Sequence, residues 1–197
     1  MSATASRTVF VDRDGVIIVN RPDHVRSWAD VAFLPGALEG LALLAQSAID
    51  VVVVTNQAIV NRGQASRADV DDINRRIVLE VKHHGGSIRS VEVCPHRPDE
   101  GCSCRKPEPG LLVDAAARYG IRLSDAIMIG DHEHDLEAAR RADAASILVL
   151  SGRTTKRPPD DLPAGCVAVL PGLLEAAQFI VERAGIQAEA LTSATRR

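Results

Sequence analysis

Short, continuously apolar runs alternate along this chain with segments whose apolar residues recur at helical spacing. Runs such as 8–11 and 51–54 have no polar face, which is typical of strands buried on both sides of a parallel sheet. The stripe within 38–48 instead predicts an amphipathic helix. Because strands that alternate with helices form a parallel sheet covered on both faces, the sequence predicts a Rossmann-like α/β fold.

The same patterns predict the order of the elements. Strands are expected at 8–11, 51–54, 88–93, 126–129, 147–150 and 166–170. Helices are expected within 38–48, 66–85, 111–119, 135–142 and 173–184. The segments 94–107 and 151–164 are expected to be loops, because they are rich in proline, glycine and polar residues.

The length of 197 residues suits one domain. We expect a single domain over 1–184, which includes the loop 94–107, followed by a flexible tail over 185–197.

Composition and charge exclude several classes of partner. Lys and Arg number 23 against 26 Asp and Glu, so no basic excess indicates nucleic-acid binding. No apolar run approaches the roughly 18 residues of a membrane-spanning helix. Residues 1–7 have no apolar core of signal-peptide length, so we expect a cytoplasmic protein. A monomer is expected, because no apolar stripe is left over for a partner.

Carboxylates and hydroxyls follow three of the predicted strands. Asp12 and Asp14 end the first strand, Thr55 ends the second, and Asp131 ends the fourth. Ligands of parallel sheets bind at the carboxyl ends of the strands, so these side chains should meet in one crevice. Carboxylates held close together need a cation or a shared proton, and oxygen ligands favour Mg²⁺.

Phosphate-binding groups accompany these acids. Asn56 offers an amide beside the Thr55 hydroxyl, and Lys106 offers a positive charge. A carboxylate nucleophile, a second carboxylate for proton transfer, Mg²⁺ and phosphate-binding donors together indicate phosphoryl transfer through an aspartyl-phosphate. Taken singly, each piece has a plainer reading: Asp131, for instance, is also placed to cap the next helix.

Four segments of the chain resemble the four motifs of the haloacid dehalogenase superfamily of phosphatases. With h for an apolar residue, those motifs are hhhhDxDG, hhhT/S-N, a lysine and hGDxxxD. Their counterparts here are 9–15, 51–56, Lys106 and 128–135, and the resemblance runs from about residue 8 to residue 152.

The resemblance implies a role for each of these residues. Asp12 would be the nucleophile, and Asp14 would protonate the leaving alkoxide and then activate water. Thr55 and Asn56 would hold the phosphoryl oxygens, while Lys106 would offset the charge of nucleophile and phosphate.

The same resemblance implies a magnesium site. Its ligands would be Asp12, Asp131 and Asp14, the last through its backbone carbonyl. Asp135 would lie behind them without binding the ion.

Three cysteines and a histidine fall within eleven residues, as Cys94, His96, Cys102 and Cys104. Three thiolates and one imidazole complete a tetrahedral Zn²⁺ site with no open position, which is typical of a structural metal. The fourth cysteine, Cys166, lies in an apolar stretch and is read as a core residue.

This cysteine–histidine loop, together with Cys-Arg-Lys-Pro at 104–107, resembles a small capless branch of the superfamily. That branch contains the heptose-bisphosphate and the histidinol-phosphate phosphatases, and the predicted loops leave no room for a lid domain. The zinc loop would set Arg105 and Lys106 at the crevice.

Two features favour the heptose branch. Gln57 extends the Thr55-Asn56 segment as in those enzymes and is assigned to substrate binding. Arg105 would bind a second phosphate, with Arg62 and Arg21 as weaker candidates. The expected activity is Mg²⁺-dependent removal of the 7-phosphate from D-glycero-D-manno-heptose 1,7-bisphosphate.

Two alternatives stay open. Histidinol phosphate would bring an amine and an imidazole, for which Asp23 and Glu133 are the available acids. A zinc-stabilised binding module without catalysis is the non-enzymatic alternative. The run 132–135 is read as the first turn of a helix, in preference to a second metal site.

Overall fold

The computed structural model describes residues 8–157 and 164–195. Its strands are β1 (Thr8–Val11), β2 (Asp50–Asn56), β3 (Ser90–Cys94), β4 (Ile127–Gly130), β5 (Ala145–Val149) and β6 (Cys166–Leu170). They form one sheet in the order β3-β2-β1-β4-β5-β6, and every neighbouring pair is parallel. The predicted parallel α/β architecture is confirmed.

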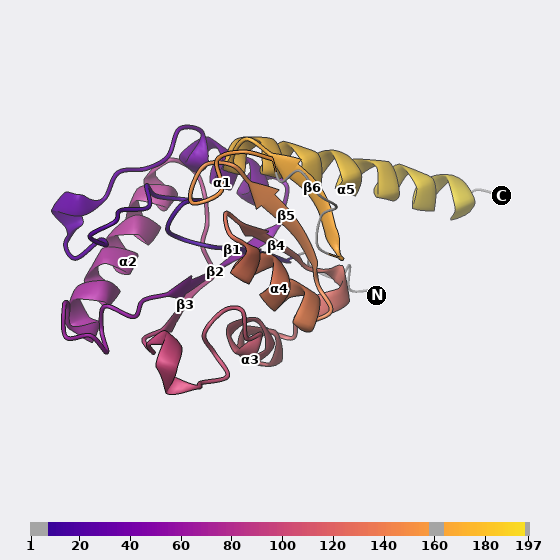
Figure 1. Cartoon of the computed structure of the whole chain (residues 1–197). Helices are drawn as coiled ribbons and strands as arrows, with labels where there is room; N and C mark the ends of the chain where they lie inside the picture. The colour runs from indigo at the N-terminus through magenta and orange to yellow at the C-terminus, as the bar shows by residue number, and fades with distance from the viewer. Residues whose placement is uncertain (1–7, 158–163, 196–197) are drawn as a thin grey trace.

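Helices connect the successive strands from β1 to β5, and a last helix follows β6 (Figure 1). They are α1 (Ala37–Gln46), α2 (Arg67–His83), α3 (Gly110–Tyr119), α4 (Glu133–Arg141) and α5 (Leu173–Thr195). Three single 3-10 turns lie at Trp28–Asp30, Pro98–Glu100 and Leu123–Asp125. No helix of the described residues is long and apolar enough to cross a membrane.

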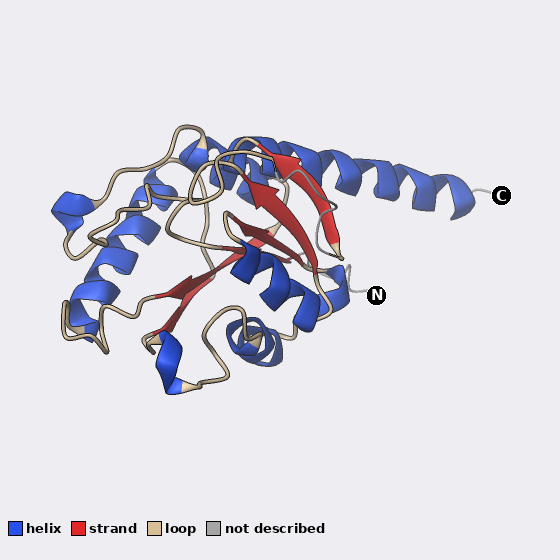
Figure 2. Cartoon of the chain, viewed as in Figure 1, coloured by secondary structure: helices blue, strands red, loops and turns tan. Residues whose placement is uncertain are grey.

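Helices pack on both faces of the sheet (Figure 2), and two separate apolar cores lie between the sheet and these helices. The first joins Val9 and Val11 of β1 to residues of α1, α2 and α5. The second joins Phe10 of β1 to residues of α3 and α4. Successive side chains of a strand point to opposite faces, so a run with no polar member supplies both cores at once.

Strand β2 is longer than the predicted run of 51–54. It spans Asp50–Asn56, so Thr55 and Asn56 are its last two residues. Pairing with β1 on one side and β3 on the other extends the strand past the apolar residues. Backbone pairing with β3 therefore fixes the two polar residues at the carboxyl end of β2, whereas in a loop their positions would be less constrained.

The C-terminal helix differs from the prediction. Helix α5 continues from Leu173 to Thr195, beyond the end expected at residue 184, so the predicted tail is helical as far as Thr195. The segment after Gly185 contains three alanines with one glutamine, one glutamate and one leucine, which all favour helix. Within the expected loop 151–164, residues 158–163 lie outside the described part of the chain.

The connection between β1 and α1 packs back onto the domain. Val16, Ile17 and Ile18 are fully buried in the core beneath α1 and α5. A bridge between Ile18 and Phe33 closes this segment on itself. The segment therefore belongs to the same domain as the sheet. The described residues contain no separate cap domain, as expected.

Candidate active site

The carboxyl ends of β1, β2 and β4 meet at one crevice of about 360 Å³. Parallel pairing places these three strand ends side by side, as the sequence predicts. The side chains expected to react, to bind substrate or to bind magnesium all line this crevice: Asp12, Asp14, Thr55, Asn56, Gln57, Arg105, Lys106 and Asp131.

Lys106 lies at the bottom of the crevice, and its side chain is only 2% exposed. Its Nζ lies 2.9 Å from Oδ1 of Asp12 and 2.6 Å from Oδ1 of Asp135, and donates to the Val54 carbonyl at 2.8 Å. Burial opposes the lysine charge, but attraction to Asp12 and Asp135 outweighs it and raises the pKa above its usual value. The lysine is a fixed positive charge beside the expected nucleophile.

Only one of the two carboxylate oxygens of Asp12, Oδ1, has hydrogen-bond partners among the described residues. Oδ1 accepts from the Arg13 backbone N–H at 2.8 Å and from Lys106. Burial raises the pKa of the Asp12 carboxyl to about 8, Lys106 opposes this, and the nearby carboxylates of Asp135 and Asp131 add to it. A carboxylate in this setting requires more positive charge than Lys106 supplies.

Four carboxylates gather around two fully buried cations at the crevice: they are Asp12, Asp14, Asp131 and Asp135, beside Arg13 and Lys106. Carboxylates held this close together favour a hard divalent cation between them. The donor set therefore fits Mg²⁺, which prefers carboxylate oxygens.

The expected ligand Asp131 is closely confined. Its Oδ2 accepts from the Arg153 backbone N–H at 2.6 Å, and a Cβ on Gly15 or Gly152 would collide with that oxygen. Gly15 also has a φ of +93°, a conformation that favours glycine. These two glycines leave space for the carboxylate at the point where the cation is expected.

The resemblance implies Mg²⁺ ligands from the side chains of Asp12 and Asp131 and from the backbone carbonyl of Asp14, and in the structure the Asp135 carboxylate joins the first two. Oxygens of Asp12, Asp131 and Asp135 lie within 4.8 Å of one another, and the side chain of Asp14 is not in this group. The reason is that Arg13 draws the Asp14 carboxylate aside. Any part for Asp14 in metal binding is therefore limited to its backbone carbonyl.

Asp14 is surrounded by donors. The Arg13 guanidinium donates to both of its oxygens, and Gln57 Nε2 donates to Oδ2 at 2.7 Å and to Thr55 Oγ1 at 2.8 Å. Gln57 was assigned to substrate, but its amide nitrogen is occupied by these two partners. Sequence reasoning missed Arg13, although a charged residue between two aspartates at the end of a buried strand is a usable signal.

Asn56 ties the second motif to the lysine. Its side-chain amide donates to the Lys106 carbonyl at 3.0 Å and accepts from the Lys106 N–H at 3.1 Å. The amide assigned to phosphate therefore holds the backbone on each side of the lysine side chain. This contact spans 50 residues of sequence and joins β2 to the cysteine loop.

The four expected zinc ligands form one cluster. Cys94 Sγ lies 3.8 Å from Cys102 Sγ and 3.2 Å from Cys104 Sγ, and His96 Nδ1 lies 3.2 Å from Cys104 Sγ. Bonds of about 2.3 Å to a tetrahedral zinc separate two thiolates by about 3.8 Å, so the cluster has the size of a Cys3His site. Burial raises the pKa of the Cys94 thiol, which a bound cation would counteract.

The loop that holds the cysteine–histidine cluster also carries residues that line the crevice. Arg105 Nη1 donates to the His96 carbonyl at 3.0 Å, so the backbone of an expected zinc ligand positions the arginine. Lys106 follows directly. Cys166, outside this cluster, was expected in the core, but it is only half-buried, because it lies in the edge strand β6, where it donates to the Ala168 carbonyl.

The rim of the crevice is basic. Its lining includes Arg62, Arg105 and Arg153. Arg21, the other candidate for binding a second phosphate, is not part of the lining and instead pairs with Asp23. The two acids considered for histidinol phosphate, Asp23 and Glu133, are also absent from the described lining.

His132 caps helix α4, as the plainer reading of 132–135 requires. Its Nδ1 accepts from the His134 N–H at 3.2 Å, and Asp135 Oδ2 accepts from the His132 N–H at 3.1 Å. Ligand atoms of His132, Glu133 and His134 also lie within 4.8 Å of one another. The cap accounts for the arrangement without a second metal.

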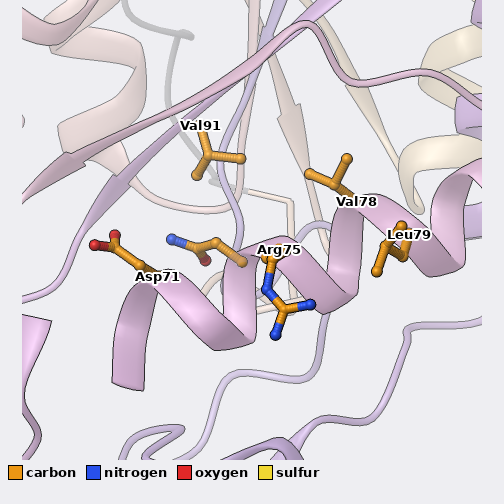
Figure 3. Close-up of a pocket in the computed structure, with 6 residues that line it drawn as sticks. Asp71, Arg75, Val78, Leu79 and Val91 are labelled. Carbon is orange, nitrogen blue, oxygen red and sulfur yellow. The ribbon is translucent and has the colours of Figure 1, made fainter. Parts of the chain in front are cut away.

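A second hollow of about 330 Å³ lies between α2 and the edge strand β3. Its lining consists of Asp71, Asn74, Arg75, Val78, Leu79 and Val91, and Figure 3 labels five of these six. It holds none of the predicted site residues.

Comparison with known proteins identifies the class. A family model described as HAD-hydrolase-like matches residues 103–176. The chain shares 37% identity over 161 residues with D-glycero-β-D-manno-heptose-1,7-bisphosphate 7-phosphatase of Pseudomonas aeruginosa, covering 81% of this chain and 90% of that protein. It shares 41% over 142 residues with the α-anomer 7-phosphatase of Mycobacterium tuberculosis, covering 70% and 74%.

A solved structure agrees with these relatives. D,D-heptose 1,7-bisphosphate phosphatase of Bordetella bronchiseptica, in complex with magnesium and phosphate, matches with a TM-score of 0.85 and 34% identity. The match covers 90% of this chain and 99% of that one. The chain is thus a HAD-like hydrolase. Within that class it belongs to the family of heptose-1,7-bisphosphate 7-phosphatases.

Proposed function

We propose that the protein is a Mg²⁺-dependent phosphomonoesterase that removes the 7-phosphate of D-glycero-D-manno-heptose 1,7-bisphosphate through an aspartyl-phosphate. The observation that carries this proposal is the buried contact of Lys106 with Asp12 Oδ1, in a crevice that also holds Asp14. Relatives that bear the name of this activity support the choice of substrate.

The first half-reaction transfers the phosphoryl group to the protein. The free oxygen of Asp12, Oδ2, attacks phosphorus, and the bond from phosphorus to the C7 oxygen breaks. Asp14 gives a proton to the departing alkoxide. Lys106 remains on Asp12 Oδ1, where its charge offsets that of the phosphate.

The second half-reaction releases phosphate. A water molecule attacks phosphorus, its proton passes to Asp14, and the bond from phosphorus to Asp12 Oδ2 breaks. Asp14 is then protonated for the next cycle, so one residue serves as acid and then as base. Thr55, whose hydroxyl lies between Gln57 and Asp14, supplies polar contacts to the phosphoryl oxygens.

Magnesium would be held by Asp12, Asp131 and the backbone carbonyl of Asp14, with Asp135 beside them on Lys106. When bound, the ion supplies positive charge to the phosphoryl oxygens. The magnesium in the Bordetella relative supports this assignment.

We further propose that Cys94, His96, Cys102 and Cys104 bind a structural zinc ion. Support comes from the tetrahedral size of the cluster and from the absence of an open position in a Cys3His set. The ion would stiffen a loop that presents Arg105 and Lys106 to the crevice.

The basic rim would hold the second phosphate of the substrate. Arg105 offers a planar guanidinium suited to phosphate, and Arg62 and Arg153 line the same crevice. An acidic rim, which the amine of histidinol phosphate would require, is not found in the described lining.

A cytoplasmic monomer completes the proposal. The four cysteines are free, and three of them would bind metal as thiolates, which suits a reducing compartment. Sedimentation of the pure protein should give the mass of one chain.

The deciding experiment measures phosphate release with Mg²⁺ from both anomers of the heptose bisphosphate and from histidinol phosphate. We expect kcat/KM for the better anomer to exceed that for histidinol phosphate at least a hundredfold, about 2.7 kcal/mol of differential transition-state binding. A ratio in favour of histidinol phosphate would overturn the substrate assignment while leaving the chemistry of Asp12 intact.

A further inference from the structure

Arg13 is a buried charge that no step of the reaction uses. It is 1% exposed and stands among the largest fully buried side chains of the described residues. A buried guanidinium destabilises a fold unless its donors are paired. Its position between the nucleophile and the proton donor therefore needs an explanation.

Each of its side-chain nitrogens has a partner. Nε donates to Asp14 Oδ2 at 3.0 Å, and Nη2 donates to Asp14 Oδ1 at 3.2 Å. Nη1 donates to the Asn74 Oδ1 at 2.8 Å. The guanidinium thus grips both oxygens of Asp14 with one edge and is held by Asn74 at the other.

Asn74 is a polar residue on the otherwise apolar face of helix α2. It lies on the buried face of α2 among Val70, Ile73 and Ile77, and is 5% exposed. An amide at such a position requires a hydrogen-bond partner, and Arg13, 61 residues away in sequence, is that partner. Helix α2 is therefore tied to the turn that carries both aspartates.

We infer that Arg13 and Asn74 are positioning residues that orient the Asp14 carboxylate for proton transfer. The inference rests on the proposed function and deepens it. Oδ2 accepts from Arg13 and from Gln57, whereas Oδ1 accepts one longer bond from Arg13. The oxygen with spare capacity, Oδ1, carries the proton to the leaving alkoxide and receives the proton of water in the second step.

A residue that only stabilises the fold would affect all substrates alike. Proton donation matters for an alkoxide, which leaves poorly without a proton, and matters little for p-nitrophenolate, which leaves as an anion. General acid catalysis contributes about 10²- to 10⁴-fold to rates of the first kind. The leaving group therefore separates an orienting role from a structural one.

The test compares kcat/KM for an alkyl phosphate and for p-nitrophenyl phosphate, because kcat/KM reports the steps up to departure of the leaving group. Asn74→Leu should lower the value for the alkyl ester about tenfold or more, and the value for the aryl ester less than about threefold. Arg13→Lys should widen this difference to about a hundredfold. Asn74→Asp, which keeps the acceptor, should restore most of the alkyl activity.

Ile77→Ala is the matched control, because it opens a cavity on the same buried face of α2 without touching Arg13. It should affect both esters equally. Equal losses on both esters in Asn74→Leu, or no loss on either, would overturn the inference. If Asn74→Leu does not fold, the ratio measured with Arg13→Lys decides.

The proposed substrate is judged by a separate result. Wild-type protein that hydrolyses both simple esters but not the heptose bisphosphate would refute the proposed substrate, while the ratio of the variants would still decide the role of Asn74.

Discussion

At the scale of the residue, the site consists of charges that constrain one another. Asp12 sits between Lys106 and two further carboxylates, so its behaviour depends on whether a divalent cation is present. The carboxylate oxygens that would bind Mg²⁺ repel one another when no cation lies between them, which destabilises the folded state.

Asp12→Asn should abolish turnover and preserve the fold. The amide has almost the same shape as the carboxylate, but it cannot form the aspartyl-phosphate, so we expect a loss of at least about 10³-fold. Phosphate release and circular dichroism of the purified variant check the two parts. Substantial residual activity would contradict the nucleophile assignment.

The stability of the metal-free protein should fall as the pH rises from about 4 to about 8. Asp12 has a folded pKa of about 8 against 3.8 for the free side chain, so between these values the folded state binds the extra proton. Stability from this group is therefore present at low pH and lost as pH passes through the folded pKa.

Magnesium should remove this penalty by pairing with the ionised carboxylate. The rise in Tm on adding Mg²⁺ should consequently be larger at pH 8 than at pH 5.5, measured by thermal unfolding. An equal rise at both values would show that Asp12 does not take part in binding the ion. The Asp12→Asn variant provides the control.

At the scale of the element, the cysteine loop connects two sites. Its ligands span 94–104, and the next two residues are Arg105 and Lys106. Asn56 at the end of β2 clasps the Lys106 backbone, so the loop is fixed to the sheet at its far end as well. A change in the conformation of the loop should therefore shift the position of Lys106.

Cys102→Ser should release zinc and reduce activity on every substrate. Three remaining ligands bind zinc far more weakly, and metal binding is coupled to folding of the loop. Zinc content by atomic absorption and Tm should both fall, with kcat reduced because Lys106 is displaced. Cys166→Ser, at a cysteine outside the cluster, is the control and should retain its zinc.

At the scale of the whole molecule, stability and activity depend on different faces. Helices α1 and α5 pack together beneath one face, and Gly40 of α1 is where their backbones approach. A Cβ at Gly40 would lie 2.9 Å from the Leu173 carbonyl oxygen and 3.1 Å from the Leu174 Cα. The crevice lies at the strand ends, away from this contact.

Gly40→Ala should accordingly destabilise the protein without changing its chemistry. Alanine favours helix by about 1 kcal/mol over glycine, but the clash with the backbone of α5 outweighs that gain. We expect a lower Tm with kcat/KM unchanged. Gly185→Ala in α5, where the added Cβ meets nothing within 4 Å, should raise Tm slightly. A Gly40→Ala variant more stable than wild type would contradict this packing.

The positions of the strands and of most helices, and the residues that line the crevice, could be predicted from the sequence. Apolar runs report burial on both faces, and polar residues at strand ends report the ligand edge, because both follow from local chemistry along the chain. Asp12, Lys106 and Asp131, which line the crevice, and the four members of the cysteine–histidine cluster were identified in this way.

Partnerships between distant side chains were decided only by the tertiary structure. The hydrogen bonds between Asn56 and Lys106 join residues 50 positions apart, and the hydrogen bond between Arg13 and Asn74 joins residues 61 positions apart. Amides and charges have several possible partners, and sequence spacing does not choose among them. The packing of the sheet against α2 brings each of these side chains next to one particular partner. Since a buried polar group needs a hydrogen bond, that neighbour becomes its partner.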